Sequence, residues 1–241
     1  KIKNIIYLYQ LSNVYPSNKR IYDINGGAKM YEELLKVLRK EKIVAILRDV
    51  PLEKFEKTLE ILKKEGIKIL EITLNSKDVE KQFEILKEKY LNDFVIGAGT
   101  VVTLEGLNFA VENGAKFILT PNIDEEILKE AEKIGILCVC GFFTASEAMK
   151  AKKYSCCKIL KLFPAGEVPF SYLKSLKGPI NDLECMAVGG VNRNNVSEFL
   201  KAGFSCLGIG SSLVDNKLIK AGKFDELREN IIAIKKAAES F

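Results

Sequence analysis

The sequence holds one lysine and one glutamate in positions where each could do chemistry. Lys161 lies within the apolar run "KILKLF" at 158–163, and Glu71 lies within "IKILEITL" at 67–74. Burial disfavours the charged form of an amine, and a neutral amine can attack a ketone to form a Schiff base. A carboxylate nearby can then move protons. The pair could therefore carry out covalent catalysis on a carbonyl compound.

Side chains alternate along a strand, and this alternation predicts where the two residues point. In the run around Glu71, the face with Leu70 and Ile72 is apolar and suits covering helices, so Glu71 should point inward. The same sorting separates Lys161 from Lys158 and turns Lys161 inward too. An ion pair that only holds the core together is the alternative, and the residues alone leave the two interpretations about even.

The composition excludes several other mechanisms. The 241 residues include no histidine, which rules out Ser-His and Cys-His nucleophile pairs, a His general base and a His-ligated zinc. Proton transfer must therefore use Glu, Asp, Lys, Tyr or Cys. With 47% hydrophobic residues the chain can bury a sizeable core, yet no run reaches the ~18 apolar residues of a membrane helix.

The six cysteines favour a reducing compartment. Their spacings are C-x-C and C-C, and most lie inside apolar runs such as "ILCVC", where a cysteine behaves as a small hydrophobe. We expect reduced core thiols and a cytoplasmic protein. The positions are Cys138, Cys140, Cys156, Cys157, Cys185 and Cys206.

Residues 1–29 differ from the rest of the chain. They hold five basic residues and one acidic residue, so most of the net charge of +5 lies there and a nucleic-acid groove elsewhere is not supported. No helical or strand period continues through them. We expect an N-terminal extension that is either not native, with Met30 as the natural start and the first residue of a helix, or a loosely packed arm. Residues 30–241 should then form one domain.

From Met30 onward, short apolar runs alternate with amphipathic segments. The eight expected strands are 43–48, 67–74, 94–99, 116–121, 136–140, 158–163, 185–190 and 206–211. Between them lie helix-like segments such as "LEKFEKTLEILKKEG" and "DEEILKEAEKIG". Eight β-then-α units predict an α/β fold, a closed (β/α)₈ barrel of the TIM type with an extra N-terminal helix, and an open doubly wound sheet is the alternative.

Polar residues and glycines gather at the expected carboxyl ends of these strands, where a barrel carries its active site. Arg48, Thr100 and Asn122 follow the first, third and fourth strands, and should meet Glu71 and Lys161 at one mouth. "VGGVN" at 188–192 and "GIGSS" at 208–212 end the last two strands before helices, where backbone N–H groups can hold a phosphate.

In this order, the motifs resemble the family of 2-keto-3-deoxy-6-phosphogluconate (KDPG) aldolases, also called 4-hydroxy-2-oxoglutarate (KHG) aldolases. The match runs from about Lys42 to Ser212 through "KIVAILR", "GIKILEITL", "IGAGTV", "GAKFILTPN", "LKLFPA", "GGVN" and "GIGSSLV". The resemblance implies a (β/α)₈ barrel, a homotrimer, and class I aldolase activity that needs neither metal nor cofactor. Its substrate would be a phosphorylated 2-keto-3-deoxy sugar acid, cleaved to pyruvate and glyceraldehyde 3-phosphate. Cleavage of 4-hydroxy-2-oxoglutarate to pyruvate and glyoxylate is a further expectation, and binding of nucleic acid or membrane is not expected.

The resemblance also assigns roles to residues. Lys161 would form the imine with the substrate ketone, and Glu71 would shuttle protons. Thr100 would contact the pyruvyl part. The candidate substrate-binding residues are Arg48, Thr73, Asn75, Thr100, Asn122, Phe163, Pro164 and Val188, and the candidate phosphate-binding residues are Gly189, Gly190, Gly210 and Ser211.

Three positions depart from the usual pattern of the family. Many members have Arg at the position of Asn75 and Thr at that of Val188, a position linked to stereochemistry at C4; Cys140 stands where Pro is usual. "LNS", "TPN" and "AVGG" look more like the related 2-keto-3-deoxy-6-phosphogalactonate aldolases, although that branch usually has Pro at the position of Thr73. The preferred C4 epimer therefore stays open.

Two other functions compete with the aldolase. One is an inactive barrel that only binds a sugar-acid phosphate, which predicts stabilisation by ligand without turnover. The other is a different phosphate-binding barrel enzyme, such as an isomerase or a thiamine-phosphate synthase, which does not need a lysine inside the sixth strand.

Overall fold

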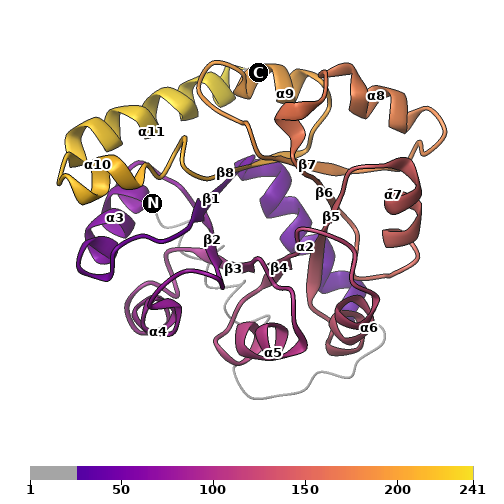
Figure 1. Cartoon of the computed structure of the whole chain (residues 1–241), viewed down its shortest axis with the longest axis horizontal. Helices are drawn as coiled ribbons and strands as arrows, with labels where there is room; N and C mark the ends of the chain where they lie inside the picture. Colours follow the sequence, from indigo (N-terminus) through magenta and orange to yellow (C-terminus); the bar gives the residue numbers. More distant parts are fainter. Residues whose placement is uncertain (1–25, 241) are drawn as a thin grey trace.

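The computed structural model describes residues 26–240, and within them eight parallel strands close into a barrel in sequence order. Figure 1 shows the strand ring at the centre, with the helices around it. The closed ring confirms the (β/α)₈ prediction and excludes the open sheet. The strands are β1 (Ile43–Leu47), β2 (Ile69–Thr73), β3 (Val95–Gly99), β4 (Phe117–Leu119), β5 (Leu137–Phe142), β6 (Leu160–Leu162), β7 (Cys185–Val188) and β8 (Cys206–Ile209).

Each strand is followed by at least one helix, as the periodicity predicts. The helices are α2 (Gly26–Glu41), α3 (Leu52–Lys64), α4 (Val79–Lys89), α5 (Leu104–Glu112), α6 (Glu125–Ile134), α7 (Ala145–Ala151), α8 (Ser171–Lys177), α9 (Val196–Lys201), α10 (Asn216–Lys220) and α11 (Phe224–Glu239), with a short 3-10 turn at Ala165–Glu167. Local signals set several ends. The Asp124 side chain caps the first turn of α6, and Gly135 ends that helix at φ 81°.

The extra N-terminal helix lies across one end of the strand ring (Figure 1). Arg39 of α2 makes a two-pronged ion pair with Glu184, the residue before β7, with N···O distances of 2.8 and 2.7 Å. This contact places α2 at the amino-terminal end of the strands, opposite the mouth. The helix begins at Gly26 and not at Met30 as predicted, and the predicted properties of 1–25 lie outside the described residues.

Small residues make room inside the barrel for large side chains on neighbouring strands. A Cβ at Gly97 of β3 would overlap the ring of Phe117 on β4, which is fully buried. A Cβ at Gly99 would overlap the carboxylate of Glu71 on β2. Inward glycines on β3 therefore let one aromatic ring and one carboxylate occupy the interior.

No helix within residues 26–240 is long and apolar enough to span a bilayer. The six cysteines are free and buried, as the sequence predicts. Burial raises the pKa of the Cys185 thiol to about 12 and also raises that of Cys206.

The close fit at Gly97 yields a stability prediction. Gly97→Ala should lower the free energy of unfolding by about 1–3 kcal/mol, because the added methyl group must displace Phe117. Gly178→Ala is the control, since its Cβ would meet only Ser175 O at 3.4 Å, and its cost should stay within about 0.5 kcal/mol. Urea unfolding of both variants measures the difference, and equal costs would contradict this account of the barrel interior.

Candidate active site

Lys161 and Glu71 face each other across the barrel. Their strands, β6 and β2, are four places apart in the ring of eight. The strand register pairs Glu71 with Gly97 on β3, Gly97 with Phe117 on β4, and Phe117 with Leu137 on β5. The β5 partner of Lys161 is Gly141, which lies four residues after Leu137. Half a circuit of a barrel of shear 8 shifts the register by four residues. The two side chains therefore start at the same height on opposite walls.

Both side chains are buried, and burial acts on each pKa. Lys161 is 6% exposed and Glu71 is 2% exposed. Burial lowers the pKa of Lys161, and the Glu71 charge opposes this effect. Burial also raises the pKa of Glu71, against the pull of Lys161 and Arg48. Low solvation thus favours a neutral amine and a protonated carboxyl group, the forms that can attack a ketone and donate a proton.

The two groups do not form the direct ion pair that was the structural alternative. Residues 26–240 contain no salt bridge between them. Glu71 Oε2 is buried and has no hydrogen-bond partner. Lys161 Nζ lies 4.7 Å from the ring centroid of Phe163, whose side chain is half-exposed at the mouth. A buried acceptor without a partner is costly unless a ligand uses it, which favours a catalytic role.

Arg48 brings a positive charge to the mouth beside Glu71. Its guanidinium donates to Asn75 Oδ1 at 2.7 Å and to Thr100 Oγ1 at 3.1 Å. Thr100 has φ 56°, a left-handed conformation that is strained for a β-branched residue. The three residues come from the ends of β1, β2 and β3. They form a cationic corner that could receive a carboxylate.

Two other predicted residues occupy different settings. Thr73 is fully buried, and its hydroxyl hydrogen-bonds with Ser76 Oγ at 2.6 Å and donates to Leu47 O at 3.4 Å, so it supports the loops above β1 and β2. Asn122 is exposed after β4, and its backbone carbonyl accepts from Thr120 Oγ1 at 2.6 Å. Of the two, only Asn122 presents its side chain at the rim.

The glycines after β7 and β8 leave backbone amides available. Gly189 and Gly190 have φ of 86° and 80°, and a Cβ on Gly190 would lie 2.8 Å from Gly166 Cα. Within the described chain, no hydrogen bond uses the N–H groups of Gly189, Gly190, Gly210 or Ser211. Such amides are typical of phosphate-binding loops.

The expected helix N-termini do not follow these glycines directly. α9 begins at Val196 and α10 at Asn216, in each case after an intervening loop. The reason is local, because the carbonyl of Gly190 accepts from the side chains of Asn192 and Asn195, and that of Gly210 accepts from two backbone amides. Turn hydrogen bonds thus replace an immediate helix. The last predicted residues, Val188 and Pro164, lie beside this loop: a Cβ on Gly208 would lie 2.8 Å from Val188 Cγ2, and one on Gly189 would lie 3.2 Å from Pro164.

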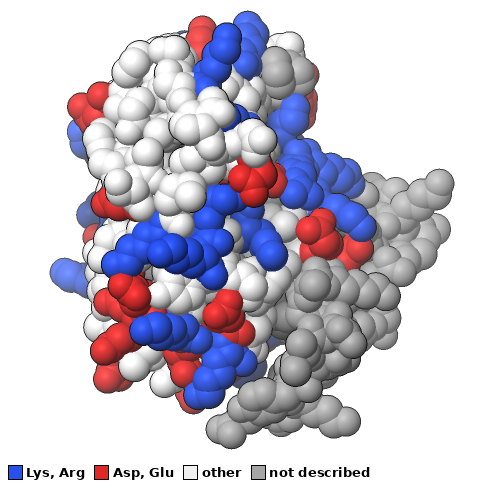
Figure 2. Space-filling view, turned by 90° about the vertical axis from the view of Figure 1, so that its right-hand side faces the viewer, with Lys and Arg blue, Asp and Glu red and all other residues white. Residues whose placement is uncertain are grey.

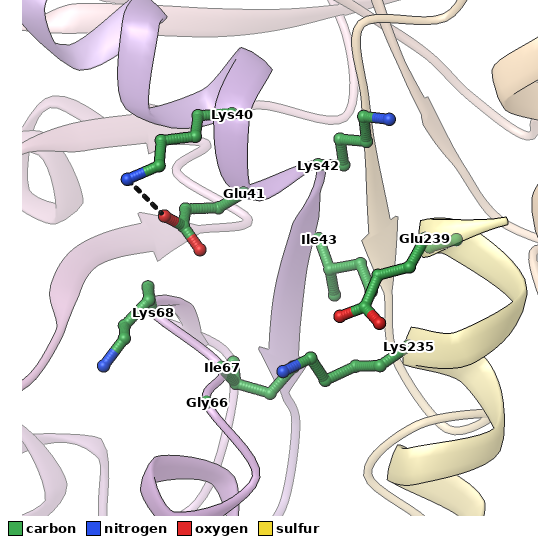
Figure 3. Close-up of a pocket in the computed structure, with 10 residues that line it drawn as sticks. Lys40, Glu41, Lys42, Ile43, Gly66, Ile67, Lys68, Lys235 and Glu239 are labelled. Carbon is green, nitrogen blue, oxygen red and sulfur yellow. Dashed lines mark ion pairs between the residues drawn. The ribbon is translucent and has the colours of Figure 1, made fainter. Parts of the chain in front are cut away.

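A second hollow, of about 290 Å³, lies at the opposite end of the barrel (Figure 3). It is lined by ten residues that include Lys40, Lys42, Lys68 and Lys235. The carboxyl ends of α2, α3 and α11 meet there, and helix carboxyl ends favour lysines. Lys40 pairs with Glu41 at 3.7 Å. These lysines have a structural explanation, and we assign no reaction to this hollow.

Figure 2 shows lysines and arginines mixed with acidic side chains on the face that it displays, beside a broad uncharged area. The ion pairs of the described chain include Lys152–Asp182 at 2.7 Å and Lys150–Glu125 at 2.6 Å. Residues 26–240 contain no group of three or more His, Cys, Asp or Glu side chains that could hold a metal ion.

Sequence reasoning missed two residues that support the mouth, Ser76 and Asn216. Ser76 Oγ accepts from Asp49 N at 2.9 Å, and Asn216 Nδ2 donates to Arg48 O at 2.7 Å. The only signal for Ser76 is its place in a polar segment after β2. Asn216 lies seven positions beyond the end of β8, so strand-end reasoning could not reach it.

Comparison with known proteins identifies relatives of this barrel. A family model described as KDPG and KHG aldolase matches residues 34–230. The chain is 35% identical over 127 residues to the 2-dehydro-3-deoxy-6-phosphogalactonate aldolase of Escherichia coli K12, covering 52% of this chain and 62% of that relative. The chain thus aligns with about three fifths of that relative's length.

Solved structures match a larger share of the chain than this relative does. A structure described as native KDPGal has a TM-score of 0.75 at 30% identity and covers 82% of this chain and 94% of its own. The KDPG aldolase of Legionella pneumophila, with pyruvate captured as a covalent carbinolamine intermediate, has a TM-score of 0.76 at 28% identity and covers 83% and 97%.

The buried lysine yields a prediction about stability and pH. The pKa of lysine is 10.5 in the unfolded chain, and burial lowers the pKa of Lys161 in the folded protein. Between these two pKa values, unfolding therefore takes up a proton. Wild-type stability should gain from rising pH through that window. Lys161→Met removes this gain, so its stability relative to wild type should be greater at pH 7 than at pH 10.

Urea unfolding at the two pH values provides the measurement. Lys158→Met is the control, because Lys158 is exposed at the start of the same segment. A relative stability of Lys161→Met that rose between pH 7 and pH 10 would contradict the burial of a destabilised ammonium.

Proposed function

The chain belongs to the KDPG and KHG aldolase family, and from this membership and the geometry of the mouth we propose that it is a class I aldolase. Its substrate is a phosphorylated 2-keto-3-deoxy sugar acid, which it cleaves to pyruvate and glyceraldehyde 3-phosphate. The observation that carries the proposal is buried Lys161 opposite buried Glu71, with no salt bridge between them within residues 26–240 and with Glu71 Oε2 lacking a hydrogen-bond partner.

Lys161 begins the reaction. Its neutral amine attacks the C2 ketone, and the resulting carbinolamine loses water to form an imine. Because burial lowers the pKa of Lys161, more of the amine is in the nucleophilic form at neutral pH. The protonated imine then accepts the electron pair of the C3–C4 bond as that bond breaks.

Glu71 moves the protons. As a carboxylic acid it helps the carbinolamine to lose water, and as a carboxylate it takes the C4 hydroxyl proton when the C3–C4 bond breaks, which releases the aldehyde. The enamine left on Lys161 then takes a proton at C3, and water hydrolyses the pyruvyl imine. The raised pKa of Glu71 suits this dual role, because it makes the protonated form easier to reach than it is for an exposed glutamate.

The rim holds the two charged ends of the substrate. Arg48 binds the carboxylate, with Asn75 and Thr100 fixing its guanidinium. The amides of Gly189, Gly190, Gly210 and Ser211 bind the phosphate. The positive charge that many family members place at position 75 thus comes here from Arg48. Phe163 and Pro164 close the mouth next to the lysine.

A phosphogalactonate substrate is the second candidate. Its support is the neutral Asn75 and the apolar Val188, together with a relative named 2-dehydro-3-deoxy-6-phosphogalactonate aldolase. The activity on 4-hydroxy-2-oxoglutarate and the homotrimer stay predictions that the family resemblance carries, and the cytoplasmic location stays a prediction from the reduced cysteines.

Trapping with borohydride tests the chemistry directly. Incubation with pyruvate and borohydride, followed by peptide mass spectrometry, should place a reduced pyruvyl adduct on Lys161 and leave Lys158 and Lys116 unmodified. Lys116 is a useful internal control, because burial lowers its pKa to about 8 at the far end of β4. An adduct on Lys116, or none on folded protein, would overturn the proposal; stabilisation by ligand without an adduct would indicate the inactive binding barrel.

The C4 preference can be tested at Val188. Val188→Thr adds a hydroxyl at nearly constant volume to a buried residue beside the glycine loop. We expect the ratio of kcat/KM for the gluconate over the galactonate epimer to rise by about tenfold, since one hydrogen bond to a substrate hydroxyl is worth roughly 1.5 kcal/mol. Coupled assays of pyruvate release from both epimers provide the ratio. An unchanged ratio would remove Val188 from the choice of epimer.

A further inference from the structure

The peptide unit between Arg48 and Asp49 is held at both of its polar atoms. Asn216 Nδ2 donates to Arg48 O at 2.7 Å from the first turn of α10. Asp49 N donates to Ser76 Oγ at 2.9 Å in the loop after β2. Two loops that are far apart in sequence therefore fix the orientation of one peptide plane.

This peptide plane needs external support. Asp49 has φ 52°, in the left-handed region that an L-residue enters at a cost. The chain turns there directly after Arg48, so relaxation of the turn would shift the backbone at Arg48 and weaken the hydrogen bonds of its guanidinium to Asn75 and Thr100. The direction of the guanidinium thus depends on a turn held from outside.

Asn216 supports this turn although one of its own polar atoms stays unpaired, which costs free energy. Its Oδ1 is buried and has no hydrogen-bond partner. Exchange of the amide O and N positions would set two acceptors against each other at Arg48 O, so the observed orientation follows from that contact. Asp215 fixes the backbone beneath it, because its Oδ1 accepts from Lys217 N at 2.7 Å. An apolar side chain would avoid the unpaired oxygen but would lose the bond to Arg48.

We propose that Asn216 is a positioning residue for the keto-acid carboxylate, acting with Ser76 through the Arg48–Asp49 peptide. This inference rests on the proposed function, in which Arg48 binds that carboxylate. Asn216 does not touch the reacting atoms. It raises affinity for the pyruvyl half of the substrate and makes no contact with Lys161.

Pyruvate isolates this effect, because it carries the carboxylate and ketone but no phosphate. In borohydride trapping, Asn216→Ala should raise the pyruvate concentration for half-maximal adduct about 3- to 30-fold, the range expected for weakened bonds to a charged group. The adduct yield on Lys161 at saturating pyruvate should match wild type. Ser76→Ala should shift the half-saturation in the same direction, and the double variant should show less than the product of the two single effects.

Asn113→Ala is the matched control. Asn113 Nδ2 also donates to a backbone carbonyl, that of Phe109 at 2.9 Å, but at the end of α5. It should leave pyruvate half-saturation unchanged. Asn216→Asp keeps the shape and removes the donor, so it replaces the alanine variant if that protein does not fold, with the same expected shift.

The outcomes separate the two proposals. If wild type forms no adduct on Lys161, the proposed aldolase function fails. If wild type forms the adduct and Asn216→Ala saturates at the same pyruvate concentration, the positioning role fails alone. An equal shift in Asn113→Ala, or a loss of saturating yield without a change in half-saturation, would also overturn it.

Discussion

The desolvation of two ionisable groups in one barrel interior is the constraint on which the rest of this structure depends. Lys161 and Glu71 start at the same height on opposite walls and make no direct ion pair. A closed pair would cancel the two charges and quench the nucleophile. Separation across the barrel instead leaves each group to the low dielectric, which favours its neutral form. The interior thus gives up stability to keep an amine reactive.

The surrounding residues make this arrangement possible. Gly99 leaves the space that the Glu71 carboxylate occupies, and Gly97 lets Phe117 fill the layer beside it. The fixed positive charge of Arg48 lies at the rim and not in the interior. From the rim it lowers the pKa of Glu71, against the effect of burial, and contributes to the lowered pKa of Lys161. The strained backbone of Thr100 and Asp49 lies at the same rim. Two of the four non-glycine residues with positive φ in the described chain therefore lie beside Arg48, where the strands end.

The features of this site that follow from strand periodicity can be predicted from the sequence. Alternation along β2 and β6 was enough to turn Glu71 and Lys161 inward, because the period of a strand does not depend on its neighbours. The residues at the rim are harder to predict from the sequence. Thr73 was expected at the substrate, but its hydroxyl is used by Ser76 and Leu47. The link from Asn216 to Arg48 joins residues 168 positions apart, and no local pattern encodes such a contact. α9 begins at Val196 and not directly after the glycines as predicted, because the side chains of Asn192 and Asn195 donate to Gly190 O in a turn before the helix.

Because the interior follows from periodicity and the rim does not, the class of reaction can be inferred from the sequence more readily than the substrate. In the proposed mechanism, a buried lysine that faces a buried carboxyl group can form an imine with any 2-keto acid that reaches it, so register and burial define the chemistry. In the proposed function, the substrate is chosen at the rim, by Arg48, Val188 and the backbone amides of the glycine loops. Single changes there leave the interior pairing untouched, because rim residues follow the strand ends and do not fill the core. A barrel of this kind can therefore change its epimer preference with few substitutions, while any change to the interior must preserve both the lysine and the space that holds Glu71 apart from it.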